Sequence, residues 1–93
     1  MIKGFAARET DRIWQGGRSR RLPSDIQRSA LRKLRSLDSA EHLEDLRSPP
    51  GNRLERLSGD REGQYAIRIN QQWRICFRWS DGHAYDVEIC DYH

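Results

Sequence analysis

The chain has 93 residues, of which 33% are charged, and its formal net charge is +3. This length suits one small domain with a modest core, and the sequence holds no apolar run long enough to cross a membrane. The opening MIKGFAARET has no apolar stretch, so we expect no secretory signal peptide. The two cysteines, Cys76 and Cys90, suit a reducing cytoplasm as free thiols. We therefore expect one cytoplasmic domain over residues 1–93.

Basic residues are concentrated near the start of the chain. Residues 1–36 hold ten basic and three acidic residues, whereas residues 37–93 hold seven basic and eleven acidic ones. Nearly all the basic residues are arginines, whose planar guanidinium matches the geometry of phosphate. A small basic protein rich in arginine suggests a polyanionic partner, most often nucleic acid. The alternative is an ordinary charged surface in contact with solvent.

The first predicted elements are short. The segment IKGFA favours a first strand, and TDRIWQGG predicts a brief helix that starts at the capping residues Thr10 and Asp11 and ends at two glycines. The following GGRSRRLP is a basic loop that ends at Pro23.

A longer amphipathic helix is predicted from Ser24, which we expect to cap it. One face of this helix is apolar at a period of 3.6 residues and carries Ile26, Ala30, Leu31, Leu34 and Leu37. The opposite face carries arginines that either bind a partner or are simply solvated: Arg28, Arg32 and Arg35. The segment SAEHLEDLR predicts one more short helix, which SPPGN ends.

After the prolines the hydrophobic period changes to two. The segments RLERL, YAIRI, WRICFRW and AYDVEIC alternate between apolar and polar residues, which is typical of antiparallel strands with one buried face. We expect the helices to cover the apolar face, and we assign its aromatic residues to the core rather than to a base-stacking surface. That face is predicted to hold Tyr65, Ile67, Ile69, Trp73, Ile75, Phe77, Trp79, Tyr85, Val87 and Ile89. The other face is predicted to carry Arg68, Arg74, Arg78, Asp86 and Glu88, continued by Tyr92. The fold class is thus predicted as α+β, in the order β-α-α-β-β-β-β.

The turns can be predicted from the rule that residues directly opposite on antiparallel strands share a face. A three-residue loop, Asp81-Gly82-His83, would pair Trp79 with Tyr85, Phe77 with Val87 and Ile75 with Ile89, and would set Arg78 opposite Asp86. Across NQQ, the same rule pairs Ile69 with Trp73 and Arg68 with Arg74. Two like charges repel each other at such a pair, and an anionic ligand would relieve that repulsion. The pair is therefore a first indication of a phosphate site.

Two kinds of chemistry suit the remaining residues. Of the possible metal ligands, only Cys90 and His93 have the spacing of a zinc site, so we expect free thiols and no metal. Metal-free RNA cleavage needs a base for the ribose 2′-hydroxyl, an acid for the leaving 5′-oxygen and cations for the phosphorane charge. The segment Asp91-Tyr92-His93, beside a face lined by arginines, supplies those residue types. A packed or disordered end is the alternative reading of that segment.

The segments LSGDREGQYAIRINQQWRICFRW and EICDYH resemble the HigB branch of the RelE/ParE superfamily of bacterial type II toxins, and the resemblance extends to MIKGF and LRSPPGNRLERL. It implies a small domain with two helices packed on one face of a twisted antiparallel sheet. It further implies ribosome-dependent cleavage of mRNA without a metal or other cofactor. The implied partners are the ribosome, mRNA and a helix-turn-helix antitoxin of the HigA type. The resemblance implies that the protein contacts operator DNA only through this antitoxin.

The resemblance also implies roles for individual residues. Asp91, Tyr92 and His93 match the family's terminal functional triplet, and Arg74 matches its strand arginine. Gln72 stands where relatives have an asparagine that meets the mRNA. The catalytic set is therefore predicted to be Arg74, Asp91, Tyr92 and His93. Further RNA contacts are predicted at Arg56, Arg61, Arg68, Gln72 and Arg78. Ribosome contacts are predicted at Arg18, Arg20, Arg21, Arg28 and Arg32.

The sequence departs from the family pattern at two positions. In RLERLSGDREG, Glu55 and Ser58 stand where relatives have a histidine and a lysine. Either Glu55 serves as the base and Arg56 or Arg61 replaces the lost cation, or Glu55 is a surface carboxylate. The departure leaves two alternatives to a fully active ribonuclease. One is a gyrase-inhibiting toxin of the ParE type, and the other is an RNA-binding toxin with weakened cleavage.

Overall fold

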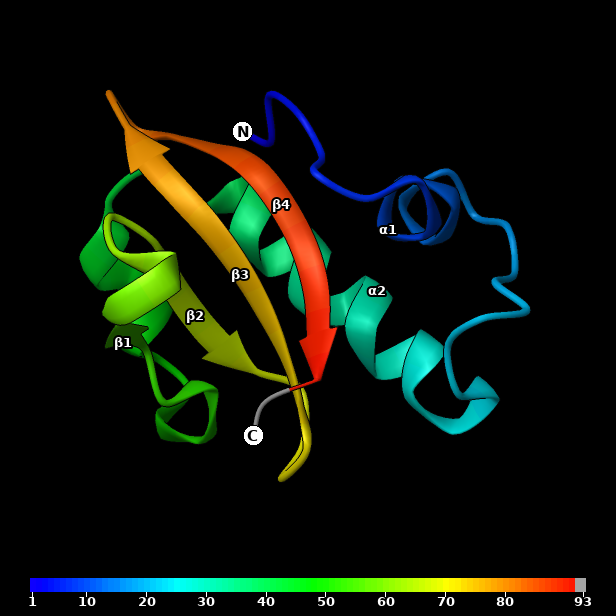
Figure 1. The fold of residues 1–93 in the computed structure, drawn as a ribbon. Helices are drawn as coiled ribbons and strands as arrows, with labels where there is room; N and C mark the ends of the chain where they lie inside the picture. The colour runs from blue at the N-terminus through cyan, green and yellow to red at the C-terminus, as the bar shows by residue number, and fades with distance from the viewer. Residues whose placement is uncertain (92–93) are drawn as a thin grey trace.

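The computed structural model describes residues 1–91 and shows an antiparallel sheet with helices packed on it (Figure 1). The helices are α1 (Arg8–Trp14) and α2 (Ser24–Ser39), followed by the short 3₁₀ helices η1 (Leu43–Arg47), η2 (Pro50–Asn52) and η3 (Gly59–Arg61). The strands are β1 (Glu55–Arg56), β2 (Tyr65–Arg68), β3 (Trp73–Ser80) and β4 (His83–Asp91). They pair in the order β1-β2-β3-β4. No helix within residues 1–91 is long and apolar enough to span a membrane.

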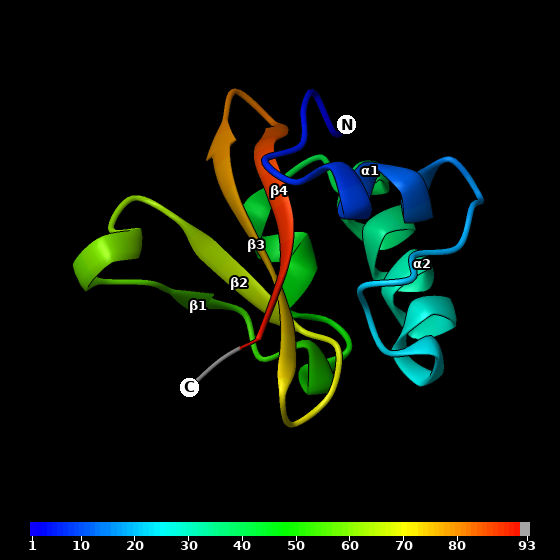
Figure 2. The ribbon, with the colours of Figure 1, turned by 45° about the vertical axis from the view of Figure 1, so that its right-hand side comes forward.

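Helices α1 and α2 lie together on one side of the β3–β4 pair, as Figure 2 shows. The apolar stripe of α2 and the inward residues of the strands form one buried cluster, which includes Leu34, Leu37, Ile67, Ile75 and Phe77. The predicted α+β class and the burial of the helical stripe are thus confirmed, because each pattern places its apolar residues on the shared interface.

The predicted first strand is reduced to two isolated bridges. Ile2 pairs with Ala84 and Phe5 with Val87, both in parallel orientation, so the opening segment runs beside β4. The backbone amide of Ile2 donates to Asp38 Oδ1 at 2.8 Å, which ties this segment to α2 as well.

Both predicted helix starts are displaced. Helix α1 begins at Arg8, so Thr10 lies inside the helix, and its buried hydroxyl accepts a hydrogen bond from the backbone amide of Ile89 at 3.0 Å. A contact to another element has therefore replaced the local capping role predicted for Thr10. In α2, Pro23 occupies the cap position and Ser24 is the first helical residue.

The predicted short helix around SAEHLEDLR forms as η1, a 3₁₀ helix rather than an α-helix. The carboxylate of Asp45 accepts hydrogen bonds from the backbone amides of Glu41 and His42, at 3.1 and 3.0 Å. These bonds lower the pKa of Asp45, because they stabilise its charged form.

The hairpin between β3 and β4 differs from the prediction. Ser80 pairs with His83, so the loop has two residues, Asp81 and Gly82, and both have positive φ as a type I′ turn requires. The extra residue lies instead within β4, where Asp86 has a φ of 52° at a β-bulge. The bulge restores the predicted pairing of Ile75 with Ile89.

The short turn and the bulge exchange the faces of two residues. Ala84, predicted on the polar face, pairs with Trp79 and is buried in the core. Tyr85, predicted in the core, pairs with Arg78 and is exposed. The assignment of Tyr85 to the core was wrong because the prediction placed the extra residue in the loop instead of the strand.

The other hairpin confirms the prediction. Arg68 pairs with Arg74 and Ile67 with Ile75, and the amide of Ile69 donates to the carbonyl oxygen of Trp73 at 2.9 Å. Two arginines therefore lie directly opposite each other on neighbouring strands.

Candidate functional site

The sheet face away from the helices has its own small apolar floor, formed by Leu57, Ala66, Cys76 and Cys90. Charged side chains surround this floor. We call this surface the arginine face and define it by Glu55, Arg61, Arg68, Arg74, Arg78 and Glu88. Strands β1 to β4 and helix η3 supply these residues, so segments distant in sequence meet here.

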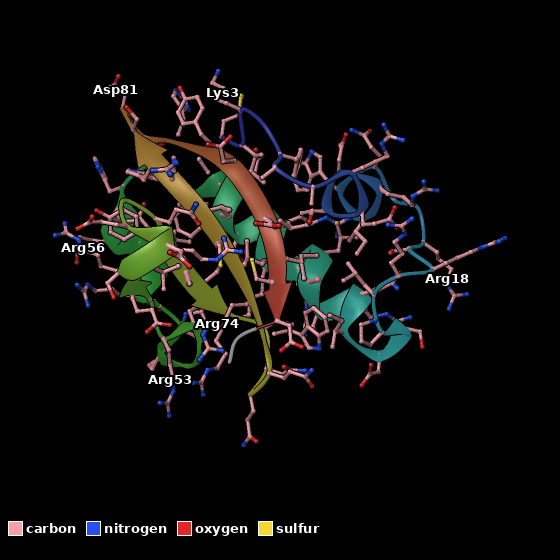
Figure 3. All side chains as sticks on the ribbon, in the orientation of Figure 1. Lys3, Arg18, Arg53, Arg56, Arg74 and Asp81 are labelled. Atoms are coloured by element: carbon pink, nitrogen blue, oxygen red, sulfur yellow. The ribbon has the colours of Figure 1, made fainter. Side chains whose placement is uncertain are left out.

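Arg74 is the most enclosed cation of this face, since only 7% of its surface is exposed (Figure 3). Its Nε lies 3.2 Å from Oε1 of Glu55, which β1 brings to the same face. The Glu55 side chain is 41% exposed, so it reaches from the surface to a buried partner. A buried guanidinium is stabilised by such a charged hydrogen bond, which also fixes the direction of its planar fork.

The Glu55 contact revises the earlier interpretation of the Arg68–Arg74 pair. We expected an anionic ligand to relieve the repulsion, but a carboxylate of the chain itself already lies against Arg74. The Nε of Arg68 is buried without a hydrogen-bond partner among the described residues. The chain itself therefore relieves part of the expected repulsion, on the Arg74 side of the pair.

Two more predicted RNA-binding residues form ion pairs across the arginine face. Arg61 Nη1 lies 3.2 Å from Glu88 Oε1 and also donates to Gln64 Oε1 at 3.0 Å. Arg78 Nε lies 3.5 Å from Asp86 Oδ2, although Arg78 pairs with Tyr85 and not, as predicted, with Asp86. These ion pairs hold two long side chains over the sheet.

Arg56 lies on the edge strand β1 (Figure 3), with its side chain on the Tyr65 side of the sheet and not on the arginine face. Its Nη2 donates to the hydroxyl of Tyr65 at 3.3 Å, and its guanidinium carbon lies 5.7 Å from the centre of the Tyr65 ring. Ser58, the other position at which the sequence departs from the family pattern, is exposed between β1 and η3.

The end of β4 meets the turn between β2 and β3. Asp91 pairs with Trp73, and the side-chain amide of Gln72 donates to Asp91 Oδ2 at 3.1 Å. Two predicted site residues are thus in direct contact. Tyr92 and His93, the other members of the predicted triplet, lie outside the described residues.

Cys76 and Cys90 are free and buried beneath the arginine face. A hydrogen bond with Cys76, together with burial, raises the pKa of Cys90, so this thiol is protonated at neutral pH. Within residues 1–91, no three side chains of His, Cys, Asp or Glu gather in a way that could hold a metal ion.

The predicted ribosome-binding arginines lie apart from the arginine face. Arg18, Arg20 and Arg21 are on the loop between α1 and α2, and Arg28 and Arg32 are exposed on α2. Two residues that the prediction missed, Arg8 and Arg12 of α1, line a cavity together with the loop arginines. Their spacing of four residues, which places both on one side of a helix, was the signal in the sequence.

The arginine face offers a fixed guanidinium at Arg74 with further cations around it, whereas the Asp91 carboxylate lies at the end of β4 opposite Trp73 and is not part of this face. This arrangement suits a phosphodiester, whose charge rises during transesterification.

A family model described as the RelE-like toxin of type II toxin–antitoxin system HigB matches residues 3–93. Toxin HigB-1 of Vibrio cholerae is 49% identical over 72 residues, which cover 77% of this chain and 76% of that protein. Endoribonuclease HigB of Proteus vulgaris is 30% identical over 93 residues, which cover both proteins completely.

Solved structures resemble the fold over the whole chain. A YoeB–YefM complex from Staphylococcus aureus has a chain that superposes with a TM-score of 0.61 at 17% identity, covering 100% of this chain and 98% of that one. A heterotetrameric YoeB–YefM toxin–antitoxin complex from the same organism gives a TM-score of 0.60 at 19% identity, with the same coverage. At such low identity these two similarities support the fold.

Proposed function

Because the chain belongs to the HigB family of RelE-like toxins of type II toxin–antitoxin systems, we propose that it is a ribosome-dependent endoribonuclease that cleaves mRNA without a metal. The relative from Proteus vulgaris carries the name of an endoribonuclease, which supports this activity. Cleavage of mRNA would stop translation and growth, and the toxin would act in the cytoplasm.

The observation that carries the proposal is the environment of Arg74. A guanidinium that is almost fully buried, held in direction by Glu55 and opposed by Arg68 on the neighbouring strand, is a fixed positive charge on this face. Such a fixed charge is typical of a site that is preorganised for negative charge appearing in the reaction. The scissile phosphate supplies that charge.

The reaction is a transesterification. The ribose 2′-hydroxyl loses its proton and attacks the adjacent phosphorus, while the 5′-oxygen leaves and takes up a proton. The products are a 2′,3′-cyclic phosphate and a 5′-hydroxyl. We assign proton transfer and its orientation to Asp91 and His93, stacking on the substrate to Tyr92, and the phosphate contact to Arg74.

The remaining residues of the arginine face bind the RNA backbone. Arg61 and Arg78 are held over the sheet by Glu88 and Asp86, so phosphate groups can approach their outward N–H groups. Arg68 completes this set. We add Gln72 at the turn, where it also contacts Asp91, and Arg56 on the edge strand β1 as further contacts to the RNA.

Membership in a type II family implies an antitoxin partner. We propose that this antitoxin is a helix-turn-helix protein of the HigA type, and that the toxin reaches operator DNA only through it.

The test is cleavage of mRNA on programmed 70S ribosomes, read by primer extension, with the wild type, Arg74→Gln and His93→Ala. Loss of an electrostatic contact to the transition state lowers kcat by about 100-fold or more, and we expect this for Arg74→Gln. Arg47→Gln is the matched control, because Arg47 is an exposed arginine of η1 paired with Glu44. Equal cleavage by the wild type and His93→Ala would remove His93 from the mechanism. Inhibition of gyrase supercoiling without mRNA cleavage would overturn the proposal.

A further inference from the structure

The start of β4 presents an aromatic ring on the same side of the sheet as the arginine face. Tyr85 pairs with Arg78, and residues directly opposite on antiparallel strands share a face. Tyr85 is 37% exposed, and Met1 is the other large apolar side chain that is exposed within residues 1–91. The surface therefore carries a ring that contributes little to the core.

The bulge that follows Tyr85 directs its side chain outward. In a regular strand, Tyr85 and Val87 would lie on the same face, and Val87 is buried in the core. The extra residue Asp86, at a φ of 52°, separates the two. A positive φ is uncommon for a residue with a side chain, and such residues are concentrated at functional sites.

Arg78 is held beside Tyr85 by contacts on two sides. Its Nε lies 3.5 Å from Asp86 Oδ2, and its guanidinium packs against Gly63, where a Cβ atom would lie only 2.8 Å from Nη1. Gly63 also has a φ of 88°, which favours glycine there. The Arg78 side chain remains 48% exposed, so a phosphate can reach it. Because the cation is ordered before a ligand arrives, the entropic cost of binding is lowered.

A second cation lies on the other side of Tyr85. The opening segment runs parallel to β4, with Ile2 opposite Ala84, and the amide of Lys3 donates to the carbonyl oxygen of Ala84 at 2.7 Å. Ile2 packs against the core, so the next residue, Lys3, faces the opposite side of the sheet, where Tyr85 lies. Lys3 is exposed. The Tyr85 ring is thus flanked by Lys3 and Arg78.

This group is separate from the phosphate contact proposed for Arg74. Arg78 follows Arg74 by four positions along β3, which is about 13 Å at the rise of a strand. Figure 3 shows Lys3 and Arg74 toward opposite ends of the β3–β4 pair. One phosphate therefore cannot contact both ends, whereas a continuous RNA strand can.

We propose that Tyr85 stacks on a base of the mRNA other than the two that flank the scissile phosphate, while Arg78 and Lys3 contact the phosphates beside that base. Aromatic rings among cations are the means by which proteins hold single-stranded nucleic acid, since every base has a face that can stack. Stacking of this kind adds affinity without selecting a base. The inference rests on the proposed ribonuclease function and extends its mRNA site to a nucleotide that is not cleaved.

The first test is kinetic. Tyr85→Phe keeps the ring, whereas Tyr85→Leu keeps apolar bulk without a ring, and Lys3→Gln removes the flanking charge. Arg47→Gln is the control for the loss of a surface charge elsewhere. Cleavage on programmed 70S ribosomes gives kcat and KM for each protein, and affinity is measured separately for programmed and for vacant ribosomes. Urea unfolding confirms that each variant folds.

The second test is photocrosslinking to an mRNA that cannot be cut, because a hydrogen replaces the attacking 2′-hydroxyl. This mRNA carries 5-iodouridine at one position at a time around the cleavage site, and mass spectrometry identifies the residue that is crosslinked on the ribosome.

Tyr85→Leu should raise KM about 5- to 100-fold with kcat within about twofold, because it loses one stack between a base and an aromatic ring. Tyr85→Phe should stay within about twofold of the wild type, because its ring can still stack. Lys3→Gln should reduce the slope of log K against log salt on programmed ribosomes by about 0.7, the value for one contact to a single strand. Tyr85 of the wild type should crosslink to 5-iodouridine.

Three results would overturn the inference. The first is an equal KM for Tyr85→Leu and Tyr85→Phe without a crosslink to Tyr85. The second is an equal loss of affinity for vacant and programmed ribosomes, which would assign the ring to ribosomal RNA. The third is an unchanged KM with a lost affinity for the purified antitoxin, which would make Tyr85 a protein contact.

The ribonuclease and this subsite can fail separately. A wild type that leaves unmodified mRNA intact but crosslinks through Tyr85 on the ribosome disproves the proposed ribonuclease and supports the subsite. Cleavage that Tyr85→Leu leaves unchanged, with no crosslink to Tyr85, does the reverse.

Discussion

Oε1 of Glu55 lies 3.2 Å from Nε of Arg74, and this contact joins the edge strand β1 to β3 across the intervening strand β2. The sequence was compatible with two roles for Glu55, that of a catalytic base and that of a surface carboxylate. The contact favours a third role, because a carboxylate that accepts from a guanidinium fixes the direction of that guanidinium. Glu55 is therefore best described as a positioning residue for Arg74.

Replacement of Glu55 separates positioning from proton transfer. Glu55→Gln keeps an oxygen that can accept from Arg74 Nε, so we expect kcat within about threefold of the wild type and an unchanged pH–rate profile. Glu55→Ala leaves Arg74 without this contact, and kcat/KM should fall by about tenfold, the equivalent of about 1.4 kcal/mol. Single-turnover cleavage on programmed ribosomes between pH 5 and 9 measures both. Loss of the acidic limb in Glu55→Gln would show instead that Glu55 is the base.

Gln72 should act through Asp91. Its amide donates to Asp91 Oδ2 at 3.1 Å, so Gln72→Ala removes a hydrogen bond that directs the carboxylate. We expect kcat to fall by about three- to tenfold with a small change in KM, since orientation affects the chemical step. Gln72→Asn, whose amide is one methylene shorter, should recover less than half of the loss. A rise in KM at constant kcat would show that Gln72 contributes to RNA binding only and does not orient Asp91.

Thr10 should matter for stability. Thr10 is 1% exposed, and its hydroxyl accepts a hydrogen bond from the amide of Ile89. Thr10→Val has nearly the same shape but leaves that buried amide without an acceptor, which costs about 1–3 kcal/mol of unfolding free energy. Thr10→Ser keeps the hydroxyl and should lose less. Urea denaturation of the three proteins measures the difference, and an unchanged midpoint in Thr10→Val would contradict the role of this bond.

The lowered pKa of Asp45 predicts that the stability of the protein depends on pH. Backbone hydrogen bonds to His42 and Glu41 lower its pKa in the folded protein, so its contribution is present above the pKa of the unfolded chain, about 3.9, and is lost as the pH falls through the folded value. Asp45→Asn should therefore lower the urea midpoint at pH 7, and the difference from the wild type should shrink below about pH 4. A difference that stays constant down to pH 2 would show that the charge of Asp45 does not contribute.

The sequence predicted best where a pattern repeats along an element. The stripe of α2 and the alternation of β2 and β3 each have several residues in agreement, so Leu34, Ile67 and Ile75 were placed correctly. The opposition of Arg68 and Arg74 followed from that alternation. Repeated patterns average over local exceptions, which is why they predict burial well.

Single-residue features were harder to predict. Thr10 looked like a cap, yet its hydroxyl bonds to Ile89, which is 79 residues away in the chain. The contact between Glu55 and Arg74 could not be predicted from the local sequence, because it depends on the order of three strands in the sheet. The Ser19 and Gln27 contacts that shape the basic loop are likewise tertiary, and no short-range spacing encodes them.

The bulge at Asp86 determines on which face of the sheet each later side chain of β4 lies. Upstream, Ala84 points inward and Tyr85 outward, whereas downstream it is the odd-numbered Val87 and Ile89 that point inward. Deletion of Asp86 would remove the extra residue and leave Val87 and Ile89 facing the core, whereas deletion of Val87, which follows the bulge, would turn Glu88 and Cys90 toward the core and Ile89 toward Arg74. The faces of these residues are thus specified by the number of residues in the strand as well as by their identity, and a single deletion in β4 should be tolerated at the bulge but not after it.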